Sequence, residues 1–316
     1  MNRDAMGLIV KRDDGSEIVN YDDQSFPSYI YDGWIEPNAP WERVPHFHED
    51  IEMMTVKSGK LMYSVNGKNL LLNEGDTIFI NSNQIHYNYC IDGGSATYVI
   101  FVAHPSILMS SVPVEMQAIR PIIDNPDIPY IRFRYKNEFT EAVRNIMHSL
   151  PEKRHDPFEI TLSFFRIWDL IRKQSACYGA TKEVASDPHM RYFKMMNRYI
   201  TESYAGQVTL DNIAQSAGIS RSLCNTIFKD YVNESPVTYL MRFRARKVAE
   251  HLRSNSGTLT EIAAMTGFGG TSYMSETFRK FFGMSPSDYK KKYREISASG
   301  GYVPAPGAGG GAGATG

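Results

Sequence analysis

The stretch LDNIAQSAGIS, at residues 210–220, decides the fold of the C-terminal part of this chain. It recurs as LTEIAAMTGFG at residues 259–269, with leucine, isoleucine, alanine and glycine at the same four positions. A following segment, FKDYVNESPVTY at residues 228–239, recurs as FRKFFGMSPSDY at residues 278–289. Chance does not produce two such alignments in the same order, so the sequence contains two copies of one structural unit.

Each copy has the pattern of a helix-turn-helix. In the first copy, the small side chain of Ala214 lets a second helix pack closely, and Gly218 permits a left-handed turn. Ser220 is the predicted N-cap of a helix from Arg221 to Tyr231, and the matching helix of the second copy begins near Thr271. Between the copies, residues 237–253 form one predicted amphipathic helix that fixes their spacing.

The second helix of each copy is the candidate recognition helix, because its outward positions carry short polar side chains that reach base edges. The DNA-binding candidates are Arg221, Ser222, Asn225, Thr226 and Lys229 in the first copy, and Thr271, Ser272, Ser275, Glu276, Arg279 and Lys280 in the second. The amide of Asn225 suits adenine and the carboxylate of Glu276 suits cytosine, whereas the basic residues at the helix ends suit phosphates.

The distribution of charge supports a polyanionic partner for the C-terminal part. Residues 1–188 carry 18 Lys and Arg against 26 Asp and Glu, whereas residues 189–294 carry 16 against 8, so the two parts have net charges of −8 and +8. The alternative is a helical bundle that contacts protein through a solvated basic face. That alternative leaves the duplicated polar helix unexplained, so we favour double-stranded DNA.

The motifs GF at 267–268, SY at 272–273, FRKFFG at 278–283 and SP at 285–286 resemble the signature of the AraC/XylS family of transcription regulators. The resemblance covers about residues 189–293. It implies seven helices, two recognition helices in successive segments of the major groove, and control of promoters.

Three residues depart from the AraC/XylS pattern. Met274 stands where Phe is usual, and we expect a volume-conserving exchange in the core. Asn233 replaces a Gly, and Asn tolerates the left-handed conformation. Glu276 stands where a basic residue is common, so either it reads cytosine or the second unit binds DNA loosely.

The N-terminal part has a β pattern followed by a helical one. From residue 27 to 103, short apolar runs alternate with turn signals such as Asn66-Gly67, and from about residue 136 the apolar period is helical. The fold class is therefore multidomain α+β. The predicted segments are a β domain at 1–135, a helical segment at 136–178, a linker at 179–188, a DNA-binding domain at 189–294, and a disordered Gly/Ala-rich tail at 295–316. The AraC/XylS resemblance implies that the helical segment is the dimerisation segment, although packing against its own β domain would explain its apolar stripes equally well.

The pattern HFHEDIE at residues 46–52 with Gly59, and Gly75 with His86, resembles the two cupin motifs. Residues that depart from these motifs are Pro40, Asn81, Asn83 and Cys90. The cupin resemblance implies a barrel in which three imidazoles and one carboxylate converge. The two histidines of the first motif are expected on one strand, where residues two apart share a face.

The interior of this barrel is the predicted effector site, for a carbohydrate or another small organic molecule. The ligand-binding candidates are His46, His48, Glu52, His86, Tyr63 and Trp34. The first four are also the candidate metal ligands, but the sequence favours hydrogen-bonded histidines without a metal, and no cofactor is predicted. The alternative function is a metal-dependent cupin enzyme fused to a DNA-binding domain.

The predicted protein is a ligand-responsive regulator without catalytic residues. Cys90, Cys177 and Cys224 lack the spacing of a zinc site or a disulfide framework, and no apolar run is long enough for a signal peptide or a membrane span. We therefore expect reduced thiols in a cytoplasmic protein. The expected partners are promoter DNA, a small-molecule effector and a second copy of the chain, with RNA polymerase as a further candidate. Effector, operator and direction of regulation stay open.

Overall fold

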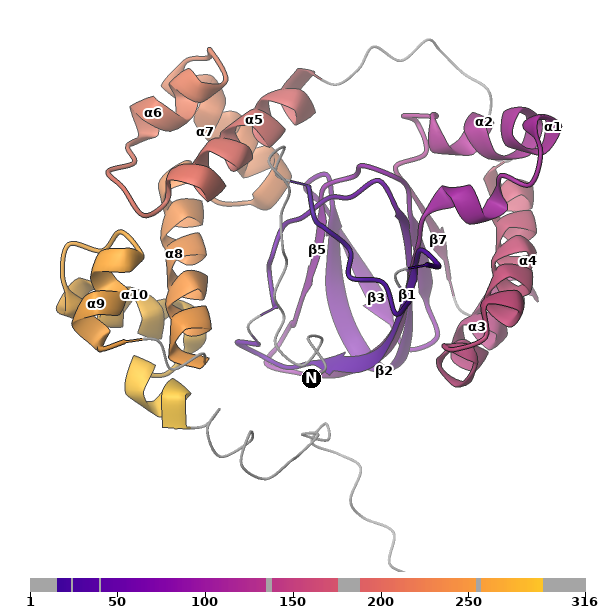
Figure 1. Cartoon of the computed structure of the whole chain (residues 1–316), viewed down its shortest axis with the longest axis horizontal. Helices are drawn as coiled ribbons and strands as arrows, with labels where there is room; N and C mark the ends of the chain where they lie inside the picture. Colours follow the sequence, from indigo (N-terminus) through magenta and orange to yellow (C-terminus); the bar gives the residue numbers. More distant parts are fainter. Residues whose placement is uncertain are drawn as a thin grey trace, which may run out of the picture. The chain divides into compact units, whose positions relative to one another are not determined.

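The computed structural model describes residues 16–23, 25–39, 41–134, 138–175, 188–253 and 257–291 (Figure 1). Residues 179–187 of the predicted linker, Cys177 and the tail at 295–316 lie outside these ranges. The chain divides into two compact units. One comprises residues 1–37, 41–203 and 208–239, and the other comprises residues 38–40, 204–207 and 240–316. The domain boundaries drawn from the sequence stay predictions.

The N-terminal domain is built on antiparallel strands, as the alternating pattern predicts. The strands are β1 (Ser28–Ile35), β2 (Ile51–Val65), β3 (Lys68–Asn73), β4 (Thr77–Ile80), β5 (His86–Tyr89), β6 (Ala96–Ala103) and β7 (Tyr130–Phe133). Their order is β1-β6-β2-β4-β7, and β3 and β5 also pair with β2. The predicted hairpin turn between β2 and β3 is confirmed, with Asn66 and Gly67 both at positive φ. The cupin-like β domain is thus present.

Strand β2 contributes to both halves of this domain. Its first part pairs with β4 and β6, and its last part pairs with β3 and β5. The pairing with β6 shifts register between Val56 and Ser58, where one extra residue forms a β-bulge. Gly59 follows at φ 77°, and a Cβ there would lie 2.4 Å from the carbonyl oxygen of Ser95. The close approach of β6 therefore requires glycine at this position.

Two helices follow the strands, as predicted for residues 136–178, and they cover one face of the sheet. They are α3 (Glu138–Ser149) and α4 (Pro157–Ser175), and Figure 1 shows α4 alongside β7. Side chains at alternate positions of the strands, such as Ile51 and Met53, form one core with Phe164 and Trp168 of α4. Because side chains alternate along a strand, Glu52 points to the opposite face, away from these helices.

The segment between β6 and α3 contains short elements that the sequence pattern did not predict. They are η2 (Pro105–Leu108), α1 (Val112–Val114), the π-helical η3 (Glu115–Ile119), α2 (Arg120–Ile123), β7 and, after α3, η4 (Pro151–Lys153). α1, η3 and α2 follow one another without a break from Val112 to Ile123, but the π-helical stretch and two prolines interrupt the 3.6-residue period there. The remaining elements have only three or four residues each. Buried residues of this segment, including Leu108 and Ile122, complete the core under α4.

The C-terminal part is helical, as predicted. Its helices are α5 (Pro188–Ser203), α6 (Leu210–Ser216), α7 (Arg221–Val232), α8 (Pro236–Arg253), α9 (Leu259–Met265) and α10 (Thr271–Phe282). Residues 286–291 are also helical. Helices α6 and α7 form the first helix-turn-helix and α9 and α10 the second. The predicted helix between the copies is α8.

Local signals in both copies are confirmed at the turns. Gly218 and Gly267 have φ values of 66° and 75°, in the left-handed region, and Asn233 ends α7 in the same conformation. The hydroxyl of Ser220 accepts a hydrogen bond from the backbone N–H of Leu223, which makes it the N-cap of α7. Met274 is fully buried, as its expected core role requires.

No helix within the described ranges has the length and apolar character that crossing a bilayer demands.

Candidate effector site and nucleic-acid interface

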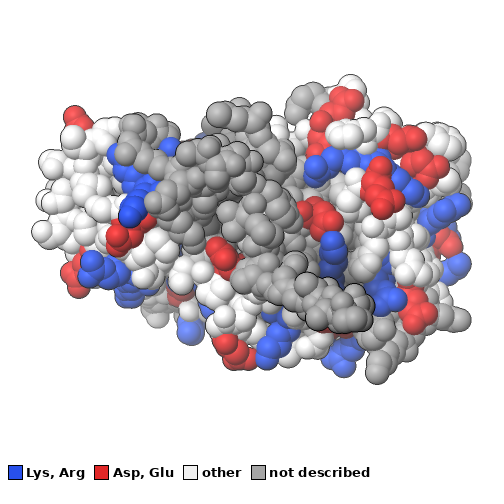
Figure 2. Space-filling model, turned by 90° about the horizontal axis from the view of Figure 1, so that it is seen from below, with Lys and Arg blue, Asp and Glu red and all other residues white. Residues whose placement is uncertain are grey.

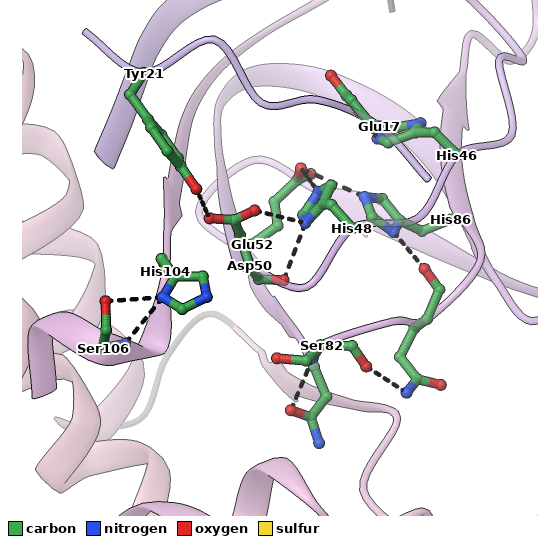
Figure 3. A network of polar contacts seen from close by, with 12 residues as sticks. Glu17, Tyr21, His46, His48, Asp50, Glu52, Ser82, His86, His104 and Ser106 are labelled. Atoms are coloured by element: carbon green, nitrogen blue, oxygen red, sulfur yellow. Dashed lines mark hydrogen bonds and ion pairs between the residues drawn. The ribbon is translucent and has the colours of Figure 1, made fainter. Parts of the chain in front are cut away.

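Four side chains predicted to line one site lie together inside the β domain (Figure 3). His46 and His48 precede β2, Glu52 is the second residue of β2, and His86 is the first residue of β5. One ligand atom from each residue lies within 4.8 Å of those of the others. His48, Glu52 and His86 are buried, and His46 is partly buried. The convergence is brought about by the fold, since the four residues span 41 positions.

The expectation that His46 and His48 share a strand is wrong. His46 forms only an isolated bridge with His86, through backbone N–H···O bonds of 3.1 and 2.9 Å, and His48 lies in the irregular segment before β2. The rule that residues two apart on a strand share a face therefore does not apply to His46 and His48. The bridge nevertheless holds the His46 and His86 rings with their centroids 4.2 Å apart.

All three imidazole rings are oriented by the backbone. Nδ1 of His46 lies 2.8 Å from the carbonyl oxygen of Val44, and Nδ1 of His86 lies 2.9 Å from that of Gln84. Nδ1 of His48 lies 3.0 Å from the carbonyl oxygen of Asp50. A carbonyl oxygen only accepts hydrogen bonds, so Nδ1 carries a proton in each ring and Nε2 is directed to the site.

Glu52 lies at the centre of the cluster. Its Oε2 is 3.7 Å from Nε2 of His48 and 3.4 Å from Nε2 of His86. The hydroxyl of Tyr63 donates a short hydrogen bond to Oε1 of the same carboxylate. Glu52 and Tyr63 are 11 residues apart on one strand, an odd separation that would place them on opposite faces of a regular strand. The bulge after Val56 brings both side chains to the same side.

The charges of these groups follow from their surroundings. Burial would raise the pKa of the Glu52 carboxyl, but His86 and His48 hold that pKa well below its usual range. Burial and the neighbouring His86 hold the pKa of His46 well below its ordinary value. Burial opposes the charged form of His48 as well, but the carboxylates around it, Glu52 foremost, raise its pKa. The site thus combines an ionised carboxylate with at least one neutral imidazole.

These donor atoms fit a metal ion. Three imidazole nitrogens and one carboxylate are ligands of Zn²⁺ and of other transition metals, and metal-binding histidines commonly donate their second N–H to a backbone carbonyl. Nε2 of His86 is buried and has no hydrogen-bond partner among the described residues. A bound metal would act as a Lewis acid that attracts an oxygen or nitrogen atom of a small molecule.

The two aromatic candidates lie at different places. Tyr63 is buried and contacts Glu52 directly. Trp34, on β1, packs edge-to-face against Trp41 with 5.8 Å between ring centroids, and its carbonyl oxygen accepts a hydrogen bond from Tyr98. Tyr98 is buried, and the Glu52 carboxylate contributes to raising its pKa after burial and Tyr31. Tyr98 was not among the predicted site residues, although it lies on β6, within the β pattern predicted for residues 27–103.

Three further polar residues near the histidines were also missed. Oε2 of Glu17 lies 3.6 Å from Nε2 of His46. The hydroxyl of Tyr21 donates a 2.7 Å hydrogen bond to Asp50, whose carboxylate lies 3.9 Å from Nδ1 of His48. Glu17 and Tyr21 belong to a segment without periodic pattern, so nothing in the sequence connected them to the site. Asp50 lies within the first cupin-like motif.

In the first helix-turn-helix, all five predicted DNA-binding residues of α7 are exposed. The opposite face of α7, including Cys224 and Phe228, is buried. The amide Nδ2 of Asn225 donates a 2.9 Å hydrogen bond to the carbonyl oxygen of Arg221. Arg221 itself forms a two-point ion pair with Asp211 in the first turn of α6. Before either side chain can contact a base edge, Asn225 must give up its hydrogen bond to Arg221, or Arg221 its ion pair with Asp211.

In the second helix-turn-helix, the predicted residues of α10 also lie on the accessible side. Four of them are exposed and two, Thr271 and Ser275, are half-buried. Met274 and Phe278 form the buried face, together with residues of α8 and α9. Tyr273 is 53% exposed on the accessible side and was not among the predicted DNA contacts. An exposed aromatic residue on a recognition helix suits contact with sugars or a thymine methyl group.

Both first helices begin with the same cap. Thr209 and Asn212 form a capping box at α6, and Thr258 and Glu261 form one at α9. This shared device supports the interpretation of the two segments as copies of one unit. On the face shown in Figure 2, Lys and Arg side chains are interspersed with Asp and Glu side chains. The positive charges therefore do not form one continuous patch on that face.

Comparisons with known proteins agree with these features. A helix-turn-helix domain model matches residues 213–292, and a cupin domain model matches residues 35–102. The HTH-type transcriptional regulator YdeC of Bacillus subtilis is 25% identical over 282 residues, which cover 87% of this chain and 95% of YdeC. The HTH-type transcriptional activator RhaS of Salmonella typhimurium is 24% identical over 278 residues, which cover 84% of this chain and 94% of RhaS.

Among solved structures, ToxT from Vibrio cholerae aligns with 84% of this chain and 98% of its own, at 12% identity and a TM-score of 0.45. The two domain models match the β domain and the paired helix-turn-helix units, and the relatives named above align over nearly their whole length. The chain is thus similar to AraC-type transcription regulators, and it combines a cupin domain with a helix-turn-helix domain.

Proposed function

We propose that this protein is a ligand-responsive transcription regulator that binds promoter DNA through α7 and α10. The observation that carries this proposal is the exposure of the predicted polar residues on both helices, each opposite a buried apolar face. Two such helices on a part of the chain with net charge +8 suit successive segments of one major groove. Direct DNA contact implies a cytoplasmic location in a bacterium.

The test of DNA binding uses the full-length protein and sheared genomic DNA, with sequencing of the retained fragments. The expected result is one shared sequence motif. Affinity for that motif should fall about 10³-fold between about 50 and 200 mM salt if about six phosphates are neutralised. Retention without any shared motif, or an affinity that is independent of salt, would contradict the proposal.

The interior of the β domain is the proposed effector site. His46, His48, Glu52 and His86 supply polar groups, and Tyr63 and Trp34 supply aromatic surface, a combination that suits a carbohydrate or another small organic molecule. The double substitution His48→Ala and His86→Ala should remove the effect of effector on DNA affinity. The effector-free affinity should stay as in the wild type. A thermal melt identifies variants that fail to fold.

The second candidate function is a metal-dependent cupin enzyme joined to a DNA-binding domain. The convergence of three histidines and one glutamate favours it. We propose the regulator without catalysis, because the relatives named above are transcription regulators. The candidates differ in one measurable property: in a regulator, the occupant of the β domain changes DNA affinity, whereas in a fused enzyme the DNA affinity is independent of it.

A homodimer is the proposed assembly, with α4 at its interface. Helix α4 buries one apolar stripe against the sheet, yet Phe158 and Leu162 lie on another side of the helix, which Phe165, itself partly packed against the core, borders. Their spacing of four and three residues places them on one face. Phe158 is 75% exposed in the single chain, and a second copy of α4 would cover it. RNA polymerase would be a further partner if the protein activates transcription.

A further inference from the structure

The loop between α5 and α6, residues 204–209, is bound by a buried arginine of α8. Arg244 is only 7% exposed. Its Nε donates a 2.8 Å hydrogen bond to the carbonyl oxygen of Tyr204, and its Nη2 donates a 2.7 Å hydrogen bond to that of Gly206. The ring of Tyr204 also packs edge-to-face against Phe243, with 5.2 Å between ring centroids. One guanidinium therefore holds two carbonyl groups of the α5–α6 loop against α8.

The charge of Arg244 makes this attachment strong. Burial disfavours the charged form and lowers the pKa of the guanidinium. A buried charge is stable only when hydrogen bonds replace its lost water, and the carbonyl oxygens of Tyr204 and Gly206 supply them. Departure of the α5–α6 loop from α8 would leave these donors without their partners, which is costly in a buried place.

The α5–α6 loop is divided from its neighbours in the sequence. Residues 204–207 belong to the compact unit that contains residues 240–316, whereas the residues directly before and after them belong to the other unit. Helix α8 also passes from one unit to the other, between Tyr239 and Leu240. The chain therefore connects the two units at two places, the α5–α6 loop and α8, and Arg244 joins these two connections.

The turn of the second helix-turn-helix is shaped to accept the α5–α6 loop. A Cβ atom at Gly267 would lie 2.4 Å from the carbonyl oxygen of Tyr204 and 2.9 Å from Nε of Arg244. Gly218 occupies the same position in the first copy, yet a Cβ atom there would meet no atom of the described residues within 4 Å. Both glycines have positive φ, so the two turns differ in what packs against them. Only the second turn contacts the loop that leads into the first copy.

The recognition helix of the second copy is attached to the same group of residues. The hydroxyl of Tyr273, in the first turn of α10, donates a 3.5 Å hydrogen bond to the sulfur of Met241, which lies one turn before Arg244 in α8. The ring of Tyr273 packs edge-to-face against Phe268, the residue after Gly267, with 5.8 Å between ring centroids. Helix α8, the turn and the start of α10 thus surround the point at which the α5–α6 loop is bound.

We propose that Arg244 is a positioning residue that fixes the spacing of the two DNA segments contacted by α7 and α10. The α5–α6 loop ends at Thr209, the N-cap of α6, so the first helix-turn-helix begins directly after the bound carbonyl groups. Arg244 is too buried to contact DNA itself, and it acts by adding a second attachment to the one that α8 provides. The inference rests on the proposed binding of DNA and adds to it a residue that controls which sites are accepted.

The spacing of the two DNA segments is a sensitive measure of this role. One inserted base pair moves the second segment by about 3.4 Å and turns it by about 35° around the DNA axis. A protein whose two helix-turn-helix units are firmly attached to each other loses the contacts of one recognition helix on such a site. A protein with a loosened attachment adapts to it.

The experiment uses the full-length protein and the two-segment site recovered from genomic DNA. Three duplexes carry this site unchanged, with one base pair inserted, or with one base pair removed between its segments, and fluorescence anisotropy gives the affinities. Arg244→Met removes both hydrogen bonds, whereas Arg244→Lys keeps the charge and one donor group. The control Lys247→Met removes a positive charge from the same helix, where Lys247 pairs with Glu250. A thermal melt identifies variants that fail to fold.

A second pair of variants leaves the charge unchanged. Gly267 and Gly218 have φ values of 75° and 66°, so alanine introduces backbone strain at both positions. Gly267→Ala also forces the carbonyl group of Tyr204 away from its place beside Arg244, whereas Gly218→Ala has free space among the described residues. The comparison separates displacement of the loop from strain in a turn.

The wild type should bind both altered sites about 10-fold to 100-fold more weakly than the unchanged site. Arg244→Met and Gly267→Ala should bind the three sites with similar affinity, and Arg244→Lys should show an intermediate preference. Lys247→Met and Gly218→Ala should keep the wild-type preference for one spacing, because a change of charge or stability affects all three sites alike.

A wild-type preference for one spacing in Gly267→Ala, or in folded Arg244→Met, would overturn the role of Arg244 while leaving the proposed binding of DNA intact. Failure of the wild type to select any two-segment site would instead contradict the proposed function, and the positioning role with it.

Discussion

The guanidinium of Arg221, at the first position of α7, is held by the carboxylate of Asp211 in the first turn of α6. The pair joins the two helices of the first helix-turn-helix on its exposed side, where DNA is expected to dock. It therefore competes with any contact that Arg221 makes to a phosphate or a base.

Asp211→Asn should increase affinity for DNA of every sequence, because it removes a negative charge from the docking side and releases Arg221. The logarithm of affinity should also fall more steeply with the logarithm of salt, by about one unit of slope, if Arg221 gains a phosphate. Fluorescence anisotropy at several salt concentrations measures both quantities. Asp230→Asn, which removes the same charge from α7, is the control. A lower affinity in Asp211→Asn would mean that the ion pair positions α7 for binding.

Asn225→Ala should relax sequence preference at one base pair, at a cost of about 1–3 kcal/mol there, because a two-point contact with adenine is lost. Lys280→Ala should weaken binding to all sequences alike, since a phosphate contact carries no sequence information. Selection from a randomised site library measures both profiles. If the two variants gave the same profile, the division into base and phosphate contacts would be wrong.

Met274→Ala should destabilise the second helix-turn-helix by about 2–5 kcal/mol, because Met274 is fully buried beside Phe278. Met274→Leu conserves volume and should cost less than about 1.5 kcal/mol. Met265→Ala is the matched control, since Met265 is 42% exposed on α9. Urea unfolding followed by circular dichroism gives the free energies. Equal costs for the two alanine variants would contradict the packing of Met274.

Phe158→Glu should shift the protein from dimer to monomer, because it places a charge in the proposed interface. The substitution should leave the fold intact, since Phe158 is exposed in the first turn of α4, where a negative charge is favourable. Sedimentation velocity over a range of concentrations measures the assembly. Arg166→Glu, at another exposed position of α4, should remain dimeric. A dimeric Phe158→Glu variant would place the interface elsewhere.

The helix-turn-helix units could be predicted from the sequence because their determinants are local. Gly218 must adopt a left-handed conformation within one turn, and Ser220 caps a helix through a residue three positions away. Such signals depend on only a few neighbouring residues, so they can be recognised in the sequence of each helix-turn-helix unit. The capping box of Thr258 and Glu261 has a recognisable spacing as well and would have located the start of α9.

The β-domain site could be predicted only in part. The cupin-like spacing identified His46, His48, Glu52 and His86, yet Glu17 meets His46 across 29 positions and lies in no motif. A contact of that kind depends on where the chain before β1 crosses the domain. The helical run from Val112 to Ile123 was missed for a different reason, because its central π-helical stretch and its prolines break the 3.6-residue apolar period.

The bulge in β2 has a consequence for how this domain can change in evolution. Side chains along the strand can be exchanged one at a time, and each exchange alters the site only at that place. Deletion of a single residue between Val56 and Gly59 would instead shift every later residue of β2 by one position. Side chains after the deletion would then change faces, and Tyr63 would point away from Glu52. Lineages that acquire new ligands should therefore vary in composition here while keeping the length of this strand constant.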